Sequence, residues 1–154
     1  MSQTYVAIDT QPITLRDGLP ISLERGQNGA LVHFEGRIRK THDGKVVSKL
    51  FYECYRPLAM KEMDRILSEA NALFGLNQSF LIHRIGELSV GDTAVWVGVA
   101  SPHRKEAFAG CSYVMDQLKE RVPIWKKEIY VDGSLTWPGW HTPSHGLENS
   151  LHSP

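Results

Sequence analysis

Cationic side chains occur at three separated places in this sequence, and each place is a candidate anion-binding site. The three groups are Arg37 with Arg39, His103 with Arg104, and Lys119 with Lys126 and Lys127. Arginine suits phosphate because its planar guanidinium donates two parallel hydrogen bonds. A partly buried lysine can serve as an acid, a base or a nucleophile, because burial disfavours its charged form. These residue types therefore indicate an anionic substrate and acid–base or nucleophilic chemistry on it.

The stretch from Ser101 to Glu128 is expected to position two of these groups on one helix and a following strand. Ser101 is a good N-cap, and Pro102 is the residue type preferred at the first helical position. Pro123 should end the helix, because it lacks an N–H and disfavours helical geometry in the residue before it. Apolar residues recur at the three-four spacing of one buried helix face: Ala107, Phe108, Cys111, Val114, Met115, Leu118 and Val122.

The first turn of this expected helix carries charges of the unfavoured sign. His103, Arg104 and Lys105 lie where the helix dipole is positive and acidic residues are preferred. A bound anion between the helix N-terminus and these side chains would remove the conflict. Lys119 lies near the other end, at the edge of the apolar stripe, where partial burial could tune its chemistry.

Each cationic group also has a plain structural interpretation. Arg37 and Arg39 share strand parity and so face one side, which would equally suit an exposed strand end. Lys119 could be a lysine whose stem covers the core while its ammonium stays in water. The first helical turn could carry ordinary solvated cations. The residues alone leave these alternatives open.

The bulk composition limits the class of protein. The chain has 154 residues, which fits one domain, and its hydrophobic content of 42% and charged content of 22% are ordinary globular values. Because 17 Lys and Arg balance 17 Asp and Glu, no overall charge favours nucleic acid or an anionic membrane. No run approaches the roughly 18 apolar residues needed to span a bilayer, and no secretory signal is visible. We therefore expect a cytoplasmic protein.

The remaining motifs argue against metal, cofactor and thiol chemistry. Cys54 and Cys111 form neither a CxxC pair nor a zinc spacing, so core packing is expected for both. His141 and His145 lie four residues apart, but no helix or further ligand accompanies them, and we expect no metal. The chain contains no Walker loop, no GxSxG and no HExxH. No cofactor is expected.

The hydrophobic patterns predict an α+β or mixed α/β domain. The expected strands are 4–8, 30–38, 46–54, 80–85, 94–100 and 124–131, and the expected helices are 57–74 and 102–122. The turn signal Asp43-Gly44 predicts that strands 30–38 and 46–54 pair as an antiparallel hairpin. Residues 132–154 are rich in Gly, Pro, Ser and His and lack periodicity, which predicts a surface or partly disordered tail.

Six segments occur in a specific order along the chain. They are FEGRIR at 34–39, HDGK at 42–45, LFYECY at 50–55, HRIGELSVGD at 83–92, SPHRKEAF at 101–108 and LKERVPIWKKE at 118–128. In order and spacing this set resembles the large, catalytic subunit family of molybdopterin synthase, over about residues 28–130. The resemblance implies an α/β hammerhead with an added antiparallel β subdomain. Residues 1–131 would then form a single catalytic domain with a small β subdomain.

The same resemblance implies a sulfur-transfer enzyme of molybdenum cofactor biosynthesis. The donor would be the C-terminal Gly-Gly thiocarboxylate of a small ubiquitin-like subunit. The acceptor would be precursor Z, a cyclic pyranopterin monophosphate that becomes the molybdopterin dithiolene. Two large subunits would form a homodimer within a heterotetramer. An anionic substrate agrees with the cations at the expected helix N-terminus, and a donor on a partner agrees with cysteines that are not placed as nucleophiles.

By the family motifs, substrate binding maps to Arg37, Ile38, Arg39, His103, Arg104, Lys119, Lys126, Lys127 and Glu128. Catalysis maps to Lys119 and Lys126. We expect Arg39, His103 and Arg104 to form one pocket, which the last two could reach from the neighbouring subunit, so that activity would require the dimer. The main alternative is a non-catalytic binding module that docks a ubiquitin-like partner tail. A weaker alternative is a phosphate-ester enzyme of another kind.

Overall fold

The computed structural model describes residues 2–13 and 26–137. The elements in chain order are β1 (Gln3–Asp9), β2 (Ala30–Arg37), β3 (Thr41–His42), β4 (Lys45–Cys54), α1 (Arg56–Phe74), β5 (Gln78–Arg84), β6 (Gly86–Ser89), β7 (Thr93–Ser101), α2 (Arg104–Arg121), β8 (Ile124–Tyr130) and β9 (Leu135–Thr136). The two helices and two sheets of these described residues confirm the predicted α+β class. Neither described helix is both long and apolar enough to cross a bilayer.

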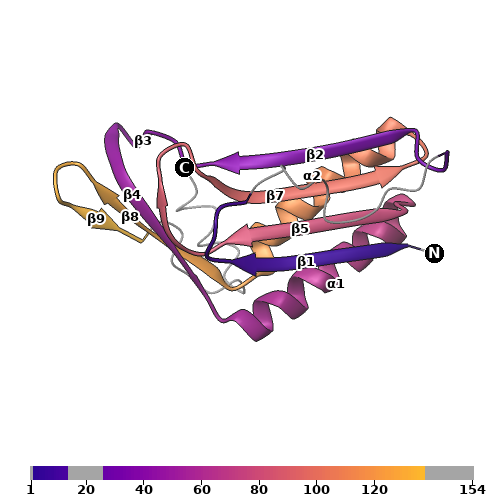
Figure 1. The fold of residues 1–154 in the computed structure, drawn as a ribbon, viewed down its shortest axis with the longest axis horizontal. Coiled ribbons are helices and arrows are strands. Elements are labelled where there is room, and N and C mark those ends of the chain that lie inside the picture. Colours follow the sequence, from indigo (N-terminus) through magenta and orange to yellow (C-terminus); the bar gives the residue numbers. More distant parts are fainter. Residues whose placement is uncertain (1, 14–25, 138–154) are drawn as a thin grey trace.

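The first sheet has the strand order β1-β5-β7-β2, and both helices lie on one of its faces (Figure 1). β1 pairs parallel with β5, and the other two pairings are antiparallel. The core between sheet and helices contains Ile66 and Leu67 of α1, Val97 and Val99 of β7, and Val114 of α2. Burial of these apolar side chains is the main force holding the two layers together.

The apolar spacing in helix 57–74 predicts a buried stripe of Met60, Met63, Ile66, Leu67, Ala70, Leu73 and Phe74. This stripe and the one predicted for the second helix are each correct except at one position. Leu73 of α1 is 65% exposed and Phe108 of α2 is 62% exposed, so the expectation that they face the core is wrong. Ala59 and Gly110 are buried in their helices instead. A Cβ on Gly110 would lie 2.8 Å from a Leu76 methyl carbon, so the small residue allows the loop after α1 to pack closely on α2.

The second sheet is antiparallel and is built around β4, which pairs with β3, β6 and β8, while β9 extends the β8 edge (Figure 1). It corresponds to the expected β subdomain. Ile38, Leu50, Leu88 and Ala94 form its separate small core. The subdomain therefore has its own apolar support for side chains that project from β4 and β8.

The predicted hairpin is wrong in one strand. Asp43 and Gly44 do form the turn, with φ values of 49° and 77°, but the turn joins β4 to the two-residue β3. β2 instead pairs with β7 in the other sheet. Its register shifts between Gly36 and Arg37, which agrees with a bulge at the strand glycine. The chain leaves the first sheet at this bulge and enters the second.

The start of α2 also differs from the prediction. Ser101 is the last residue of β7, where it pairs with Ala30, so it cannot cap the helix. His103 occupies the N-cap position with extended backbone angles, and α2 begins at Arg104. The Ser101 hydroxyl donates a hydrogen bond to the His103 carbonyl at 2.5 Å, which fixes the connection between strand and helix.

Three short strands were not predicted. β3 and β6 lie in segments between expected strands, and β9 lies in the expected tail. Such short strands have too little sequence pattern to recognise, because the edge of an existing sheet supplies most of their definition. The rest of the tail, residues 138–154 with His141 and His145, lies outside the described residues.

Candidate active site

A small pocket lies where the chain passes from the first sheet into the second. Its volume is about 70 Å³, and its lining consists of Arg37, Ile38, Arg39, Thr41, His42, Val47, Leu50, Tyr52, Lys126 and Glu128. These residues come from β2, β3, β4, β8 and the segment after β2. We call it the carboxylate pocket, because the buried side chain of Glu128 is at its centre. It brings together five of the residues predicted for the site: Arg37, Ile38, Arg39, Lys126 and Glu128.

Backbone contacts hold the segment after β2 in place. The Ile38 N–H donates to the Asp92 carbonyl at 3.0 Å, and the Ile38 carbonyl accepts from the Gly91 N–H at 2.9 Å. The Ile38 side chain is buried against Leu50 and Leu88. Ile38 therefore anchors the segment between two exposed arginines, and its side chain packs in the small apolar core of the second sheet. Arg37 pairs with Glu35 at 3.2 Å, which leaves Arg39 as the pocket guanidinium without a partner in the described residues.

The Glu128 carboxylate has three polar neighbours although its side chain is only 3% exposed. The Tyr130 hydroxyl donates to Oε2 at 2.7 Å. The Lys126 ammonium lies 3.4 Å from Oε1, and the His42 Nδ1 lies 4.0 Å from the same oxygen. A buried carboxylate is costly unless it is paired and hydrogen-bonded, so these contacts stabilise the charge in the pocket.

Strand alternation decides which β8 side chains reach this pocket. Lys126 and Glu128 share one face of β8, where they lie opposite Tyr52 and Leu50 of β4. Lys127 projects to the other face, and its ammonium lies 4.9 Å from the centre of the Phe51 ring. The structure therefore does not bring Lys127 into the pocket, contrary to its place in the predicted binding set.

We call Tyr52, which lines the pocket, and the buried His83 packed against it the floor of the pocket. Burial, with a further contribution from the Glu128 charge, raises the pKa of the Tyr52 hydroxyl to about 12. The His83 ring meets the Tyr52 ring edge-on at 4.9 Å. Burial lowers the pKa of His83 to about 4, and its Nδ1 donates to the Arg84 carbonyl at 2.8 Å. Both rings are therefore neutral near pH 7, which keeps the floor of the pocket apolar in character.

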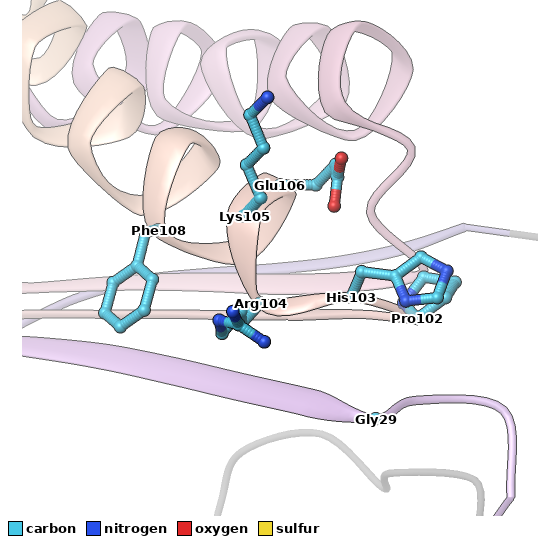
Figure 2. A pocket seen from close by; sticks show the side chains of 7 residues that line it. All are labelled: Gly29, Pro102, His103, Arg104, Lys105, Glu106 and Phe108. Atoms are coloured by element: carbon cyan, nitrogen blue, oxygen red, sulfur yellow. The ribbon is translucent and has the colours of Figure 1, made fainter.

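A second, more open pocket lies at the N-terminus of α2. It has a volume of about 860 Å³ and is lined by Gly29, Pro102, His103, Arg104, Lys105, Glu106 and Phe108. We call it the helix pocket. Arg104 and Phe108 project toward β2, whereas Lys105 and Glu106 project away from it (Figure 2). A guanidinium at a helix N-terminus beside an exposed aromatic ring can hold an anion with an attached ring system.

Gly29 sets the shape of the helix pocket. A Cβ on Gly29 would lie 2.5 Å from the Pro102 carbonyl oxygen, a contact that no side chain tolerates. The glycine thus allows the start of β2 to pass directly beneath the loop that carries His103 and Arg104. The sequence does not reveal this role, because the contact joins segments 73 residues apart.

The two pockets are at opposite ends of the β2–β7 pair. Ala30, next to the helix pocket, pairs with Ser101, whereas Arg37 in the carboxylate pocket pairs with Thr93. Seven residues of strand separate the two ends by roughly 23 Å. The expectation that Arg39, His103 and Arg104 form one pocket is therefore wrong for a single chain.

Lys119 belongs to neither pocket in the described chain. It is an exposed residue of α2, one position after the buried Leu118. Its predicted place at the edge of the apolar stripe is correct, but the partial burial that would tune an acid or base is not seen.

The cysteines are placed as core residues. Cys111 is buried in α2, and burial raises the pKa of its thiol to about 11. Cys54 is half-buried at the end of β4, and burial raises its pKa as well. Neither lines the carboxylate pocket or the helix pocket, and a thiol with a raised pKa is a poor nucleophile. No cluster of three potential metal ligands is found in the described residues.

Sequence reasoning missed His42 and Tyr52 as pocket residues. From the sequence, His42 belongs only to the HDGK segment and Tyr52 only to the expected strand 46–54. The available signal for Tyr52 was its parity with Leu50 on a strand that pairs with β8, but the β4–β8 register was not deducible from sequence.

Comparison with known proteins gives a consistent result. The family profile described as MoaE protein matches residues 8–121. The chain is 44% identical over 107 residues to the molybdopterin synthase catalytic subunit of Pyrococcus abyssi. The aligned region covers 70% of this chain and 72% of that protein. It is 37% identical over 137 residues to the subunit of the same name from Thermoplasma volcanium, at 89% and 99% coverage.

Solved structures of the same kind share the fold. The crystal structure of molybdopterin synthase from Staphylococcus aureus matches with a TM-score of 0.78 and 38% identity, covering 86% of this chain and 95% of that one. A complex of subunits 1 and 2 of the molybdopterin-converting factor from Helicobacter pylori matches with a TM-score of 0.62 over 75% of each chain. At 20% identity, the second match concerns the fold alone.

Proposed function

The chain belongs to the MoaE protein family and acts as the catalytic subunit of a molybdopterin synthase, and we propose that its carboxylate pocket and the helix pocket of a second copy together form the site of sulfur transfer. In this proposal the chain works with a small sulfur-carrier subunit, in a heterotetramer built on a homodimer of this chain. The sulfur comes from the C-terminal thiocarboxylate of the small subunit and is transferred to precursor Z in molybdenum cofactor biosynthesis.

The helix pocket is suited to the phosphate of the substrate. His103 and Arg104 lie at the N-cap and the first position of α2, where backbone N–H groups also face an anion. Arg39 in the carboxylate pocket has no partner among the described residues and supplies a second guanidinium. With Arg37 and Ile38 beside it, this segment binds the substrate from the opposite side.

The carboxylate pocket is suited to the reacting atoms. Sulfur transfer from an acyl donor develops negative charge on the thiocarboxylate carbonyl and on the oxygens of the pterin side chain. A fixed ammonium stabilises that charge and can supply a proton. Lys126 is held for this task by the buried Glu128 at 3.4 Å. Lys119, on a rigid helix, is the second catalytic lysine, and it reaches the substrate only in the assembled site.

The other expectations keep their place in this proposal. Residues 1–131 form the catalytic domain with its β subdomain, and β9 adds a strand to that subdomain from the beginning of segment 132–154. Lys127 contributes through the outer face of β8 rather than inside the pocket. The enzyme works in the cytoplasm, where its thiols stay reduced.

The observation that carries the proposal is the pair of half-buried Lys126 and buried Glu128, beside Arg39, which has no partner among the described residues. The test is to mix the protein with a thiocarboxylated small subunit and precursor Z and to assay for the dithiolene. We expect turnover with both components and none when either is omitted. Tight docking of the small subunit without any dithiolene would support the non-catalytic binding module instead.

A further inference from the structure

We propose that His42 is a positioning residue for Lys126, because the two side chains share one oxygen of the buried Glu128 carboxylate. This inference rests on the proposed function, since it gives His42 a role only if Lys126 acts on the substrate. Its content is that the protonated imidazole draws part of the Glu128 charge away from Lys126. The ammonium is then free to turn toward the substrate.

The geometry around Glu128 carries the inference. Oε2 accepts from the Tyr130 hydroxyl at 2.7 Å and is thereby occupied. Oε1 has both cationic neighbours, with Lys126 Nζ at 3.4 Å and His42 Nδ1 at 4.0 Å. Neither distance is a short charge-assisted hydrogen bond, which has a length of about 2.7–2.9 Å. At these distances the two donors share the negative charge of the single oxygen Oε1.

His42 is held rigidly in this position. Its side chain is 10% exposed, and it lies in β3 directly before the tight Asp43-Gly44 turn. The His42 Nε2 lies 3.2 Å from Asp43 Oδ2, on a side chain that is 77% exposed. The imidazole therefore bridges a carboxylate in water and a carboxylate in the protein.

Protonation of His42 changes what this bridge can do. The imidazolium has two N–H donors and can serve both carboxylates at once. In neutral imidazole one ring nitrogen carries a lone pair, which would face a carboxylate oxygen and be repelled by it. Loss of the proton therefore leaves Lys126 as the only cation on Oε1 and strengthens the Lys126–Glu128 pair.

Within the described residues, the other titratable and charged groups near His42 come from β4, β8 and the segment after β2. From β4 come Tyr52, whose raised pKa keeps it neutral, and Lys45, whose ammonium lies 5.2 Å from the centre of the Tyr130 ring. From β8 come Lys126, Glu128 and Tyr130, and burial raises the pKa of the Tyr130 hydroxyl. Arg39 lines the same pocket. In the described residues, His42 and Lys126 are the two neighbours of Glu128 Oε1 that can carry a positive charge.

The test compares kcat and KM of the heterotetramer across pH for the wild type, His42→Gln and His42→Asn. We expect the wild-type kcat to fall through one inflection with rising pH, as the imidazole loses its proton. Both variants should lose that inflection and show a kcat lower by roughly fivefold to thirtyfold, the worth of one to two hydrogen bonds. KM for precursor Z should stay within about twofold, because His42 does not hold the substrate.

Asp43→Asn is a milder variant for the same experiment. It should not disturb the turn, since asparagine tolerates a positive φ. Removing the exposed carboxylate should move the wild-type inflection to lower pH, because the imidazolium loses one of its two partners. The His42→Asn variant retains an N–H near the position of Nδ1, so it should fold even if His42→Gln does not. Thermal unfolding of each variant checks that its fold is intact.

Three outcomes would overturn the inference. They are an unchanged pH profile in both His42 variants, an effect on KM alone, and a loss of rate with the inflection still present. The last would mean a merely structural histidine. Failure of the proposed function looks different, because Lys126→Ala would then be fully active or the wild type would form no dithiolene. If Lys126→Ala is impaired while both His42 variants match the wild type, the function stands and the positioning role does not.

Discussion

The carboxylate pocket and the helix pocket differ in almost every physical respect. The first is small, partly enclosed and built around a buried acid with its paired lysine. The second is more than ten times larger in volume, open, and lined by cations next to an exposed aromatic ring. An enclosed pocket can tune proton transfer, because the surrounding protein strengthens electrostatic interactions. An open cationic one can capture an anion but tunes little, so each pocket alone lacks what the other offers.

The largest expected effect concerns the lysines. Lys126→Ala should fold and bind the small subunit but lose roughly 10²–10⁴ in turnover, the range of a positioned proton-transfer group. Lys119→Ala should do likewise if the assembled site brings Lys119 to the substrate. Single-turnover assays of dithiolene formation measure both.

The matched control is Lys61→Ala, an exposed lysine on the other helix. It should leave turnover near the wild-type value. If Lys119→Ala and Lys61→Ala gave equal, near-normal yields, Lys119 would be an ordinary surface lysine, and chemistry would be confined to the carboxylate pocket.

The floor of the carboxylate pocket predicts a pH effect on stability. The pKa of His83 is about 4 in the folded protein, below the ordinary value of 6.5. Between these values the unfolded chain binds the proton and the folded chain does not, so the free energy of unfolding should fall as pH drops from about 6.5 to about 4. The contribution of His83 to that loss is about 3 kcal/mol.

Urea denaturation at several pH values measures this effect. His83→Gln keeps an N–H donor and does not titrate, so its stability should depend less on acid pH by that amount. Equal acid sensitivity in variant and wild type would show that His83 is protonated in the folded state and that the pocket floor is not apolar.

The arginines should affect binding rather than chemistry. Arg39→Ala and Arg104→Ala should each weaken precursor Z binding by about 1.5–3 kcal/mol, the value of a charge-assisted contact, while docking of the small subunit is unchanged. Calorimetric titration with precursor Z measures both. An unaltered affinity in one variant would remove that arginine, and with it that pocket, from the binding site.

The cysteines should have the smallest effect. Cys54→Ser and Cys111→Ser should keep sulfur transfer, with a loss of stability of roughly 1–3 kcal/mol for Cys111→Ser, because a hydroxyl replaces a buried thiol. Abolished turnover in a well-folded serine variant would indicate a persulfide on the chain and contradict a donor carried by the partner.

The sequence was most informative where a pattern is local. The helix stripes and the strand over 124–131 follow from periodicity, and the Asp43-Gly44 turn follows from its residue types. The strand that pairs with β2, the close approach at Gly29 and the place of His42 depend on contacts between distant segments, which no local pattern records. The exposed Phe108 shows the same limit, because an apolar residue at helical spacing can also face a partner.

The central claim is that the two pockets act together across two copies of the chain, and subunit complementation tests it most directly. Lys126→Ala and a His103→Ala/Arg104→Ala double variant are co-expressed with different affinity tags, and the mixed dimer is purified on both tags. At a precursor concentration well below KM, each parent homodimer should be nearly inactive. The mixed dimer contains one site with every residue intact, so it should show about half of the wild-type activity. A mixed dimer as inactive as its parents would contradict the claim, because the two pockets would then have to act within one chain.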